Sequence, residues 1–278
     1  MDYVTVNDHK MHIFRTGQKN KPKLVFMSGS GTIAPVYDFK ILYEKLQDDF
    51  RIIVIEKFGY GYSDLYEGPC DIDSLVSLQR QALKEAGEEG PFILLPHSMS
   101  GLEAIRWRQK YPEDVEAIIG LDMATPLTYR EWTPEQVDQR IRSMKTMRKL
   151  NTYGLLFWLP ISNRGLDKQQ IRQHKILKRR NAMNNCYVNE AAAVIKNAEI
   201  VGSGGKIDCP VLMFVSDGKQ VSANWIENEK KFAEMTNTEI VFLNCGHYIH
   251  HYESEQISQK IKQYVKQIRN ETRQIHLV

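Results

Sequence analysis

Short apolar segments alternate with amphipathic segments along most of this chain. The apolar segments are rich in Val, Ile, Leu and Phe, and several of them show no alternation of polar and apolar positions. Strands that are buried on both faces of a parallel sheet have this character. The predicted strands are residues 11–14, 23–27, 51–55, 92–95, 117–121, 211–215 and 239–243, with residues 3–6 as an eighth candidate.

The segments between these strands show helical spacing. Apolar residues recur every three or four positions in residues 39–46, 75–83 and 102–107. In the last helix, Ile257, Ile261 and Val265 line one face, and Ser254 is a candidate N-cap. Strands that alternate with helices predict βαβ units and a doubly wound, mostly parallel sheet.

One region, from about Thr125 to Val201, interrupts the alternation. It has helical patterns and no convincing strand, and a glycine-rich segment, residues 202–205, follows it. We therefore expect a core domain formed by residues 1–124 and 202–278, and a helical insertion formed by residues 125–201. Residues 130–180 contain thirteen Lys or Arg and four Asp or Glu. Most of these charges should form a solvated helix face, although they could also attract an anionic substrate or a membrane surface.

Composition limits the class of protein. The chain has 278 residues, of which 42% are apolar, which is ordinary for a globular protein. A net charge of +3 by itself indicates no nucleic-acid partner. The four cysteines form no C-x-x-C pair, the N-terminus lacks a signal-peptide pattern, and no apolar stretch could span a bilayer. We expect a soluble cytoplasmic protein; its oligomeric state is left open.

Candidate chemistry appears where the segment 92–95 ends. The residues that follow are Pro96-His97-Ser98-Met99-Ser100-Gly101, and a helical pattern then begins. A nucleophilic serine needs such a sharp strand-to-helix turn, which holds its hydroxyl clear of the sheet. Pro96 and Ser100 stand where the G-x-S-x-G motif has glycines. The alternative role for Ser98 is therefore a helix N-cap.

A histidine near the C-terminus is the candidate general base. His247 follows the last predicted strand and precedes the last helix, and a loop at that point can reach the nucleophile. His247, His250 and His251 also have a spacing that would suit a metal site. No H-E-x-x-H motif and no carboxylate partner is evident, so we expect no metal and no other cofactor.

Four segments together resemble the motifs of α/β-hydrolases, in the same order and with similar spacing. They are residues 24–31, 55–64, 95–101 and 245–247. The resemblance implies an eight-stranded α/β-hydrolase fold in which residues 125–201 form a cap over the nucleophile. It also implies an oxyanion hole formed by the backbone N–H groups of Ser30 and Met99. Two positions depart from the family pattern: Ser28 replaces a histidine and Glu56 replaces an aspartate.

The resemblance further implies a carboxylate that orients the base. Asp122 follows the strand 117–121 and Asp217 follows the strand 211–215, and both keep the order Ser, Asp, His. In the family, the acid usually follows the later of these two strands, but it stands a few residues after its end. In this sequence Lys219 occupies that position. Some members use the earlier place. We favour Asp122, with Asp217 as the alternative acid.

The function that the resemblance implies is that of a serine hydrolase acting on a small-molecule acyl substrate. A small carboxylester is the default substrate, cleaved through an acyl-enzyme. Dehalogenases and epoxide hydrolases are disfavoured, because the similar enzymes of those classes use Asp where Ser98 stands. Cap residues Met144 and Met147 and the segment 155–159 are candidates to line the pocket or to pack the cap against the core. The alternative function is a ligand-binding or signalling protein that kept the fold.

Overall fold

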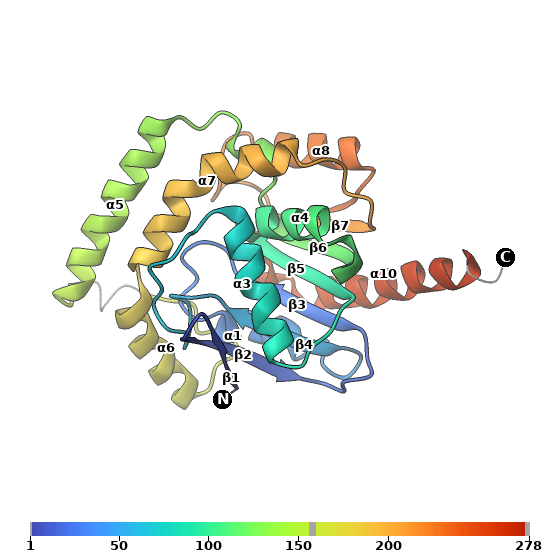
Figure 1. The fold of residues 1–278 in the computed structure, drawn as a ribbon, viewed down its shortest axis with the longest axis horizontal. Coiled ribbons are helices and arrows are strands. Elements are labelled where there is room, and N and C mark those ends of the chain that lie inside the picture. Colours follow the sequence, from blue (N-terminus) through green and yellow to red (C-terminus); the bar gives the residue numbers. More distant parts are fainter. Residues whose placement is uncertain (1, 156–159, 276–278) are drawn as a thin grey trace.

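The computed structural model describes residues 2–155 and 160–275, and a single eight-stranded sheet runs through them (Figure 1). The strands are β1 (Tyr3–Val6), β2 (His9–Thr16), β3 (Lys23–Met27), β4 (Arg51–Glu56), β5 (Phe92–Ser98), β6 (Val115–Met123), β7 (Val211–Val215) and β8 (Glu239–Phe242). Their order is β1-β2-β4-β3-β5-β6-β7-β8. Only β2 pairs antiparallel with its neighbours, and the other pairs are parallel. The prediction of a mostly parallel sheet is confirmed.

Helices cover both faces of this sheet. The helices outside residues 125–201 are α1 (Pro35–Asp38), α2 (Lys40–Tyr43), α3 (Ile72–Glu85), α4 (Ser100–Lys110), a 3-10 helix (Pro112–Asp114), α8 (Trp225–Thr236), α9 (Ile249–Tyr252) and α10 (Ser254–Ile275). On one face, Val76 of α3 and Leu102 of α4 pack with Ile53; on the other face, Ile261 of α10 packs with Ile52. The neighbouring residues Ile52 and Ile53 thus face opposite sides and are both fully buried. This explains why the strands read as continuous apolar runs.

Only part of the helix predicted for residues 39–46 forms, because α2 ends at Tyr43 and α1 lies before the predicted range. Phe39, whose φ and ψ are −86° and 0°, separates α1 from α2. Each part has four residues, but Phe39 and Leu42 are still fully buried against the sheet. The spacing therefore correctly predicted which side chains are buried, but it did not correctly predict one continuous helix.

The chain between β6 and β7 forms helices and, in its described residues, no strand. It contains a 3-10 helix (Pro126–Tyr129), α5 (Pro134–Thr152), α6 (Lys168–Asn181) and α7 (Asn185–Ser203). We call residues 125–201 the cap; α7 continues two residues beyond that predicted boundary. α5 and α6 lie at one side of the molecule in Figure 1, and α7 crosses above α4. That the cap is a separate domain stays a prediction.

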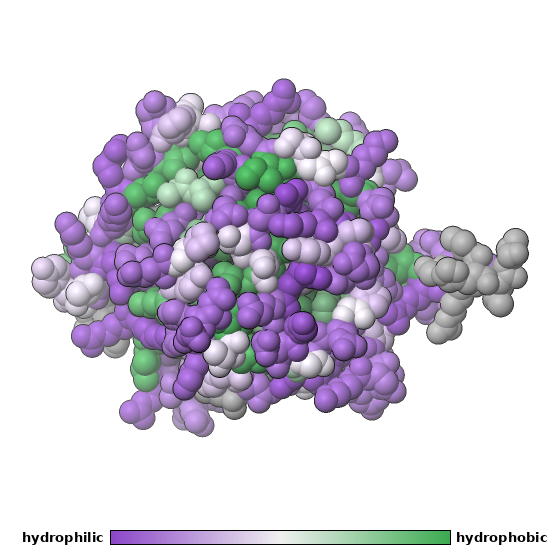
Figure 2. All heavy atoms as spheres, in the orientation of Figure 1, coloured by the Kyte–Doolittle hydropathy of each residue, from purple (hydrophilic) through white to green (hydrophobic). Residues whose placement is uncertain are grey.

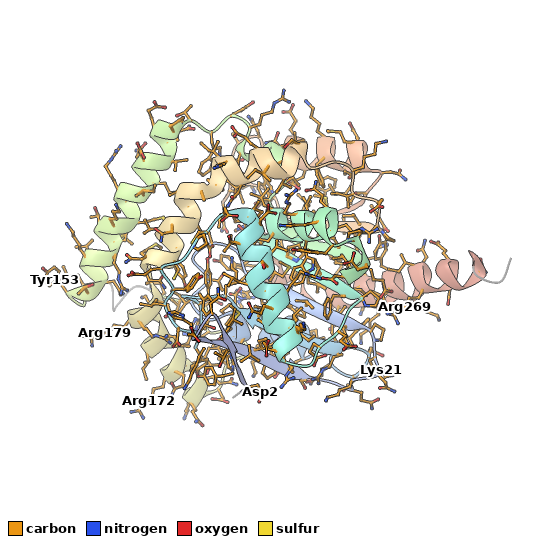
Figure 3. All side chains as sticks on the ribbon, in the orientation of Figure 1. Asp2, Lys21, Tyr153, Arg172, Arg179 and Arg269 are labelled. Carbon is orange, nitrogen blue, oxygen red and sulfur yellow. The ribbon has the colours of Figure 1, made fainter. Side chains whose placement is uncertain are left out.

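The face of the molecule drawn in Figure 2 is largely polar. Hydrophilic side chains cover most of the face shown in Figure 2, and hydrophobic ones form small patches among them. Arg172 and Arg179 of the cap helix α6 lie at the outer edge of the molecule (Figure 3) and both are exposed. In the part of the chain that the structure describes, no helix is long and apolar enough to cross a membrane.

Candidate active site

Ser98 lies at a sharp turn between β5 and α4. It is the last residue of β5, α4 begins two residues later, and its φ is +55°. A residue other than glycine rarely adopts this left-handed conformation, which the surrounding structure must stabilise. Gly101 permits the turn, because a Cβ atom there would lie 2.1 Å from the carbonyl oxygen of Ala124. This is the geometry expected of a nucleophile elbow.

Of the two departures from the G-x-S-x-G pattern, Ser100 makes contacts that stabilise the turn. Ser100 is fully buried, and its Oγ lies 2.8 Å from the carbonyl oxygen of Met27 and accepts a 3.0 Å hydrogen bond from the backbone N–H of His97. The hydroxyl therefore links the ends of β3 and β5. Pro96 lies within β5, opposite Met27 of β3.

The imidazole of His247 is held by Asp122. His247 Nδ1 and Asp122 Oδ2 are 2.6 Å apart, and Asp122 is fully buried at the end of β6. The other carboxylate oxygen, Oδ1, accepts hydrogen bonds of 2.7 Å from Ser216 N and 2.8 Å from Trp225 Nε1. Because an ionised carboxylate only accepts, Nδ1 carries a proton, and Nε2 of the neutral ring is an acceptor.

Asp217, the alternative acid, makes different contacts. Its Oδ1 accepts a 3.1 Å hydrogen bond from the backbone N–H of Lys219, and its Oδ2 lies 3.1 Å from Lys219 Nζ. The Lys219 side chain, and then its backbone N–H, lower the pKa of Asp217. Of the two candidate acids, the structure brings Asp122 against the His247 ring.

Ser98 and His247 line one cavity of about 200 Å³. Ser30 and Met99, whose backbone N–H groups were the predicted oxyanion donors, line the same cavity. Ser28, which stands in the place of the family's histidine, is fully buried, and its Oγ has no hydrogen-bond partner among the described residues. The cap contributes part of the cavity wall through Tyr129, Trp132, Arg140, Ala191 and Val194.

His97, which was not among the predicted site residues, also lies at the site. Its ring centroid lies 4.6 Å from that of His247, and its Nε2 lies 3.2 Å from the carbonyl oxygen of His247. Burial, and then the neighbouring His247 imidazole, lower the pKa of His97 well below its usual value. A neutral His97 can donate to that carbonyl and so position the His247 loop. The available signal was its place beside Ser98 in the motif.

His250 and His251 have a carboxylate partner that the sequence analysis did not find. His250 Nε2 lies 3.0 Å from Asp38 Oδ2, and His251 Nε2 lies 3.1 Å from Asp38 Oδ1. Asp38, His250 and His251 each offer one atom that could bind a metal ion, and these three atoms lie within 4.8 Å of one another. Because His247 contacts Asp122 instead, the three closely spaced histidines do not converge on one point.

The cap residues that were predicted to line the pocket or to pack against the core differ in their burial. Met144 is buried and lines a second cavity, which Ser30 also lines. Leu155 is 65% exposed, so its prediction as a pocket or packing residue is wrong. It follows the end of α5, where its side chain meets solvent. Residues 156–159 lie outside the described residues.

Comparison with known proteins identifies related chains. No family model matches the sequence. An uncharacterized protein, YbdG of Bacillus subtilis (strain 168), is 31% identical over 281 residues, covering 96% of this chain and 86% of that protein. Epoxide hydrolase 1 of Caenorhabditis elegans is 25% identical over 131 residues, covering 46% of this chain and 32% of that protein.

Solved structures with the same fold include several hydrolases. A loop variant of the haloalkane dehalogenase DbeA from Bradyrhizobium elkanii has a TM-score of 0.76 and 14% identity, and covers 99% of both chains. A thermophilic esterase from Thermogutta terrifontis, with malate bound, has a TM-score of 0.72 and 20% identity over 96% of this chain and 98% of that chain. The chain therefore has the α/β-hydrolase fold, and it belongs to the family of Bacillus subtilis YbdG.

Proposed function

We propose that this protein is a serine hydrolase that cleaves small carboxylesters, with Ser98 as nucleophile, His247 as general base and Asp122 as the acid of the triad. The observation that carries the proposal is the 2.6 Å contact between His247 Nδ1 and Asp122 Oδ2, beside a cavity that Ser98 and His247 both line. A buried carboxylate on Nδ1 orients the ring and stabilises the imidazolium that forms when Nε2 takes a proton.

The reaction proceeds in two steps. Ser98 Oγ attacks the carbonyl carbon of the ester while His247 Nε2 takes the hydroxyl proton and then passes it to the leaving alcohol. Water, activated by the same imidazole, then hydrolyses the acyl-enzyme. The backbone N–H groups of Met99 and Ser30 bind the oxyanion, and each such donor contributes about 3–4 kcal/mol to the stabilisation of the transition state.

The names of the similar proteins support hydrolysis as the class of reaction. They include an epoxide hydrolase, a haloalkane dehalogenase and an esterase. Among these activities, ester cleavage suits a serine at position 98 best. A serine that attacks an acyl carbonyl forms an ester intermediate, which water can hydrolyse.

Labelling with a fluorophosphonate tests the nucleophile. The wild type should become labelled and should hydrolyse 4-nitrophenyl esters of short fatty acids, whereas Ser98→Ala should lose both properties. Ser222 lines the same cavity and is exposed, so Ser222→Ala is a matched control that should keep both. Equal labelling of Ser98→Ala would place the nucleophile elsewhere. A wild type that neither labels nor hydrolyses any ester would favour the ligand-binding alternative.

A further inference from the structure

We propose that Arg140 of the cap binds an anionic group of the substrate, so that the preferred substrates are esters carrying a carboxylate away from the scissile bond. This inference rests on the proposed function and names its substrate class. It begins from the charge of the substrate cavity. Of the described residues lining that cavity, Arg140 is the only Asp, Glu, Lys or Arg.

Arg140 lies where two cavities adjoin. The cavity of about 200 Å³ at Ser98 and a second one of about 530 Å³ share Ser30, Trp132 and Arg140 in their walls. The described lining of the second cavity also includes no Asp, Glu or Lys. A ligand that extends from Ser98 toward the second cavity therefore passes one cationic group and no lining carboxylate.

No carboxylate of the described chain forms an ion pair with Arg140. On α5, the residues four positions before and after it are Gln136 and Met144. Asp138 is two positions away, a spacing that does not face Arg140 on a helix. An aromatic partner is Trp132, whose ring centroid lies 5.8 Å from the guanidinium carbon. The guanidinium is thus available for a ligand.

A carboxylate is an anion that a guanidinium recognises well. The planar guanidinium can donate two parallel hydrogen bonds to a carboxylate, and this geometry adds specificity to charge attraction. The wall of the cavity that Ser98 and Arg140 both line also contains the apolar side chains of Val194 and Ala191 and the rings of Tyr129 and Trp132. An apolar spacer between the ester and the carboxylate matches this wall.

The test compares pairs of esters that differ only in charge. Monomethyl esters of straight-chain dicarboxylic acids are compared with the same molecules in which the free carboxylate is a primary amide, and methanol release is measured. The wild type should show a kcat/KM at least about 10-fold higher for the best carboxylate ester than for its amide. Arg140→Gln should abolish this preference by raising KM for the carboxylate ester much more than KM for the amide ester.

A matched variant separates local recognition from the general positive charge of the cap. Arg142 lies on the same helix, is exposed and lines neither cavity. Arg142→Gln removes the same charge and should keep the preference. An equal loss of the preference for the carboxylate ester in both variants would overturn the role of Arg140. A wild type that does not distinguish the two kinds of ester would overturn it as well.

Equilibrium binding distinguishes failure of this inference from failure of the proposed function. Hexanedioate and hexanediamide, neither of which has an ester bond, are titrated into the wild type and Arg140→Gln by calorimetry. If no ester is cleaved but hexanedioate binds more tightly than the diamide in an Arg140-dependent way, the anion site stands and the hydrolase proposal fails. If esters are cleaved but hexanedioate shows no advantage, the anion site is overturned.

Discussion

At the scale of single residues, the carboxylate of Asp122 is the most heavily constrained group in the candidate site. Two donors hold Oδ1 and the His247 ring holds Oδ2, and the side chain is fully buried. Its backbone also has a left-handed φ of +50°. The carboxylate therefore has one orientation, in which it fixes the protonated nitrogen of the imidazole.

Asp122→Asn should lower kcat for ester hydrolysis by about 10³–10⁴-fold, because an amide cannot hold the same imidazole tautomer or stabilise the imidazolium. Asp217→Asn removes an equal charge from a residue that contacts Lys219, and its kcat should stay within about two-fold of the wild type. Steady-state kinetics of both variants, with thermal melts to verify folding, make the comparison. If Asp217→Asn shows the larger loss, Asp122 is not the catalytic acid.

At the scale of elements, the turn from β5 into α4 depends on close approach of backbones. A Cβ atom at Gly101 would meet the carbonyl oxygen and carbon of Ala124 at 2.1 and 3.1 Å. The backbone of Ala124 cannot move freely, because its N–H donates a 2.7 Å hydrogen bond to the carbonyl oxygen of Ser98. The space at residue 101 is therefore set by Ala124, the residue that directly follows β6, the neighbour of β5 in the sheet.

Gly101→Ala should destabilise the fold by about 1–3 kcal/mol, as expected for overpacking, although alanine is the better helix former. Gly202→Ala is the control in another helix, α7. Its new Cβ would meet only Pro126, at 3.4 Å, so we expect no loss, and up to about 1 kcal/mol of gain. Urea unfolding of both variants provides the measurement. Equal behaviour of the two would contradict the steric argument.

At the scale of the whole molecule, a buried ion network joins the cap to the sheet. Lys57 follows β4, and its Nζ lies 2.7 Å from Glu103 Oε1 of α4 and 3.2 Å from Glu190 Oε2 of α7. All three side chains are at most 4% exposed. Burial opposes the charge of Lys57, but the two carboxylates outweigh this effect and raise its pKa. Tyr60 also donates to Glu190, at 2.7 Å.

Lys57→Met should destabilise the protein by about 3–5 kcal/mol, because it leaves two buried carboxyl groups without their cation. Lys45→Met removes a surface partner of Glu255, where the side chains are 37% and 66% exposed, and should cost less than about 1 kcal/mol. Chemical denaturation of both variants measures the difference. A small effect of Lys57→Met would show that the network contributes little to holding the cap.

Features that depend on residues close together in the chain were predicted from the sequence. Features that depend on contacts between distant residues were not. The sequence alone determined the eight strands, the helices α3, α4 and α10, the helical character of the insertion and the turn at Ser98, but not α8. These features depend on burial periodicity and on residues that are neighbours in the chain. The split at Phe39 and the exposure of Leu155 were not predicted, because the same apolar pattern suits more than one local arrangement.

The tertiary structure alone decided which groups meet. Asp122 and Asp217 both follow strands in the right order, and only the folded loops bring Asp122 to the ring of His247, 125 positions away. Asp38 reaches His250 across 212 positions, and Arg140 reaches the Ser98 cavity through the packing of α5. Sequence patterns report burial, whereas charge partners depend on strand order and helix packing over the whole chain.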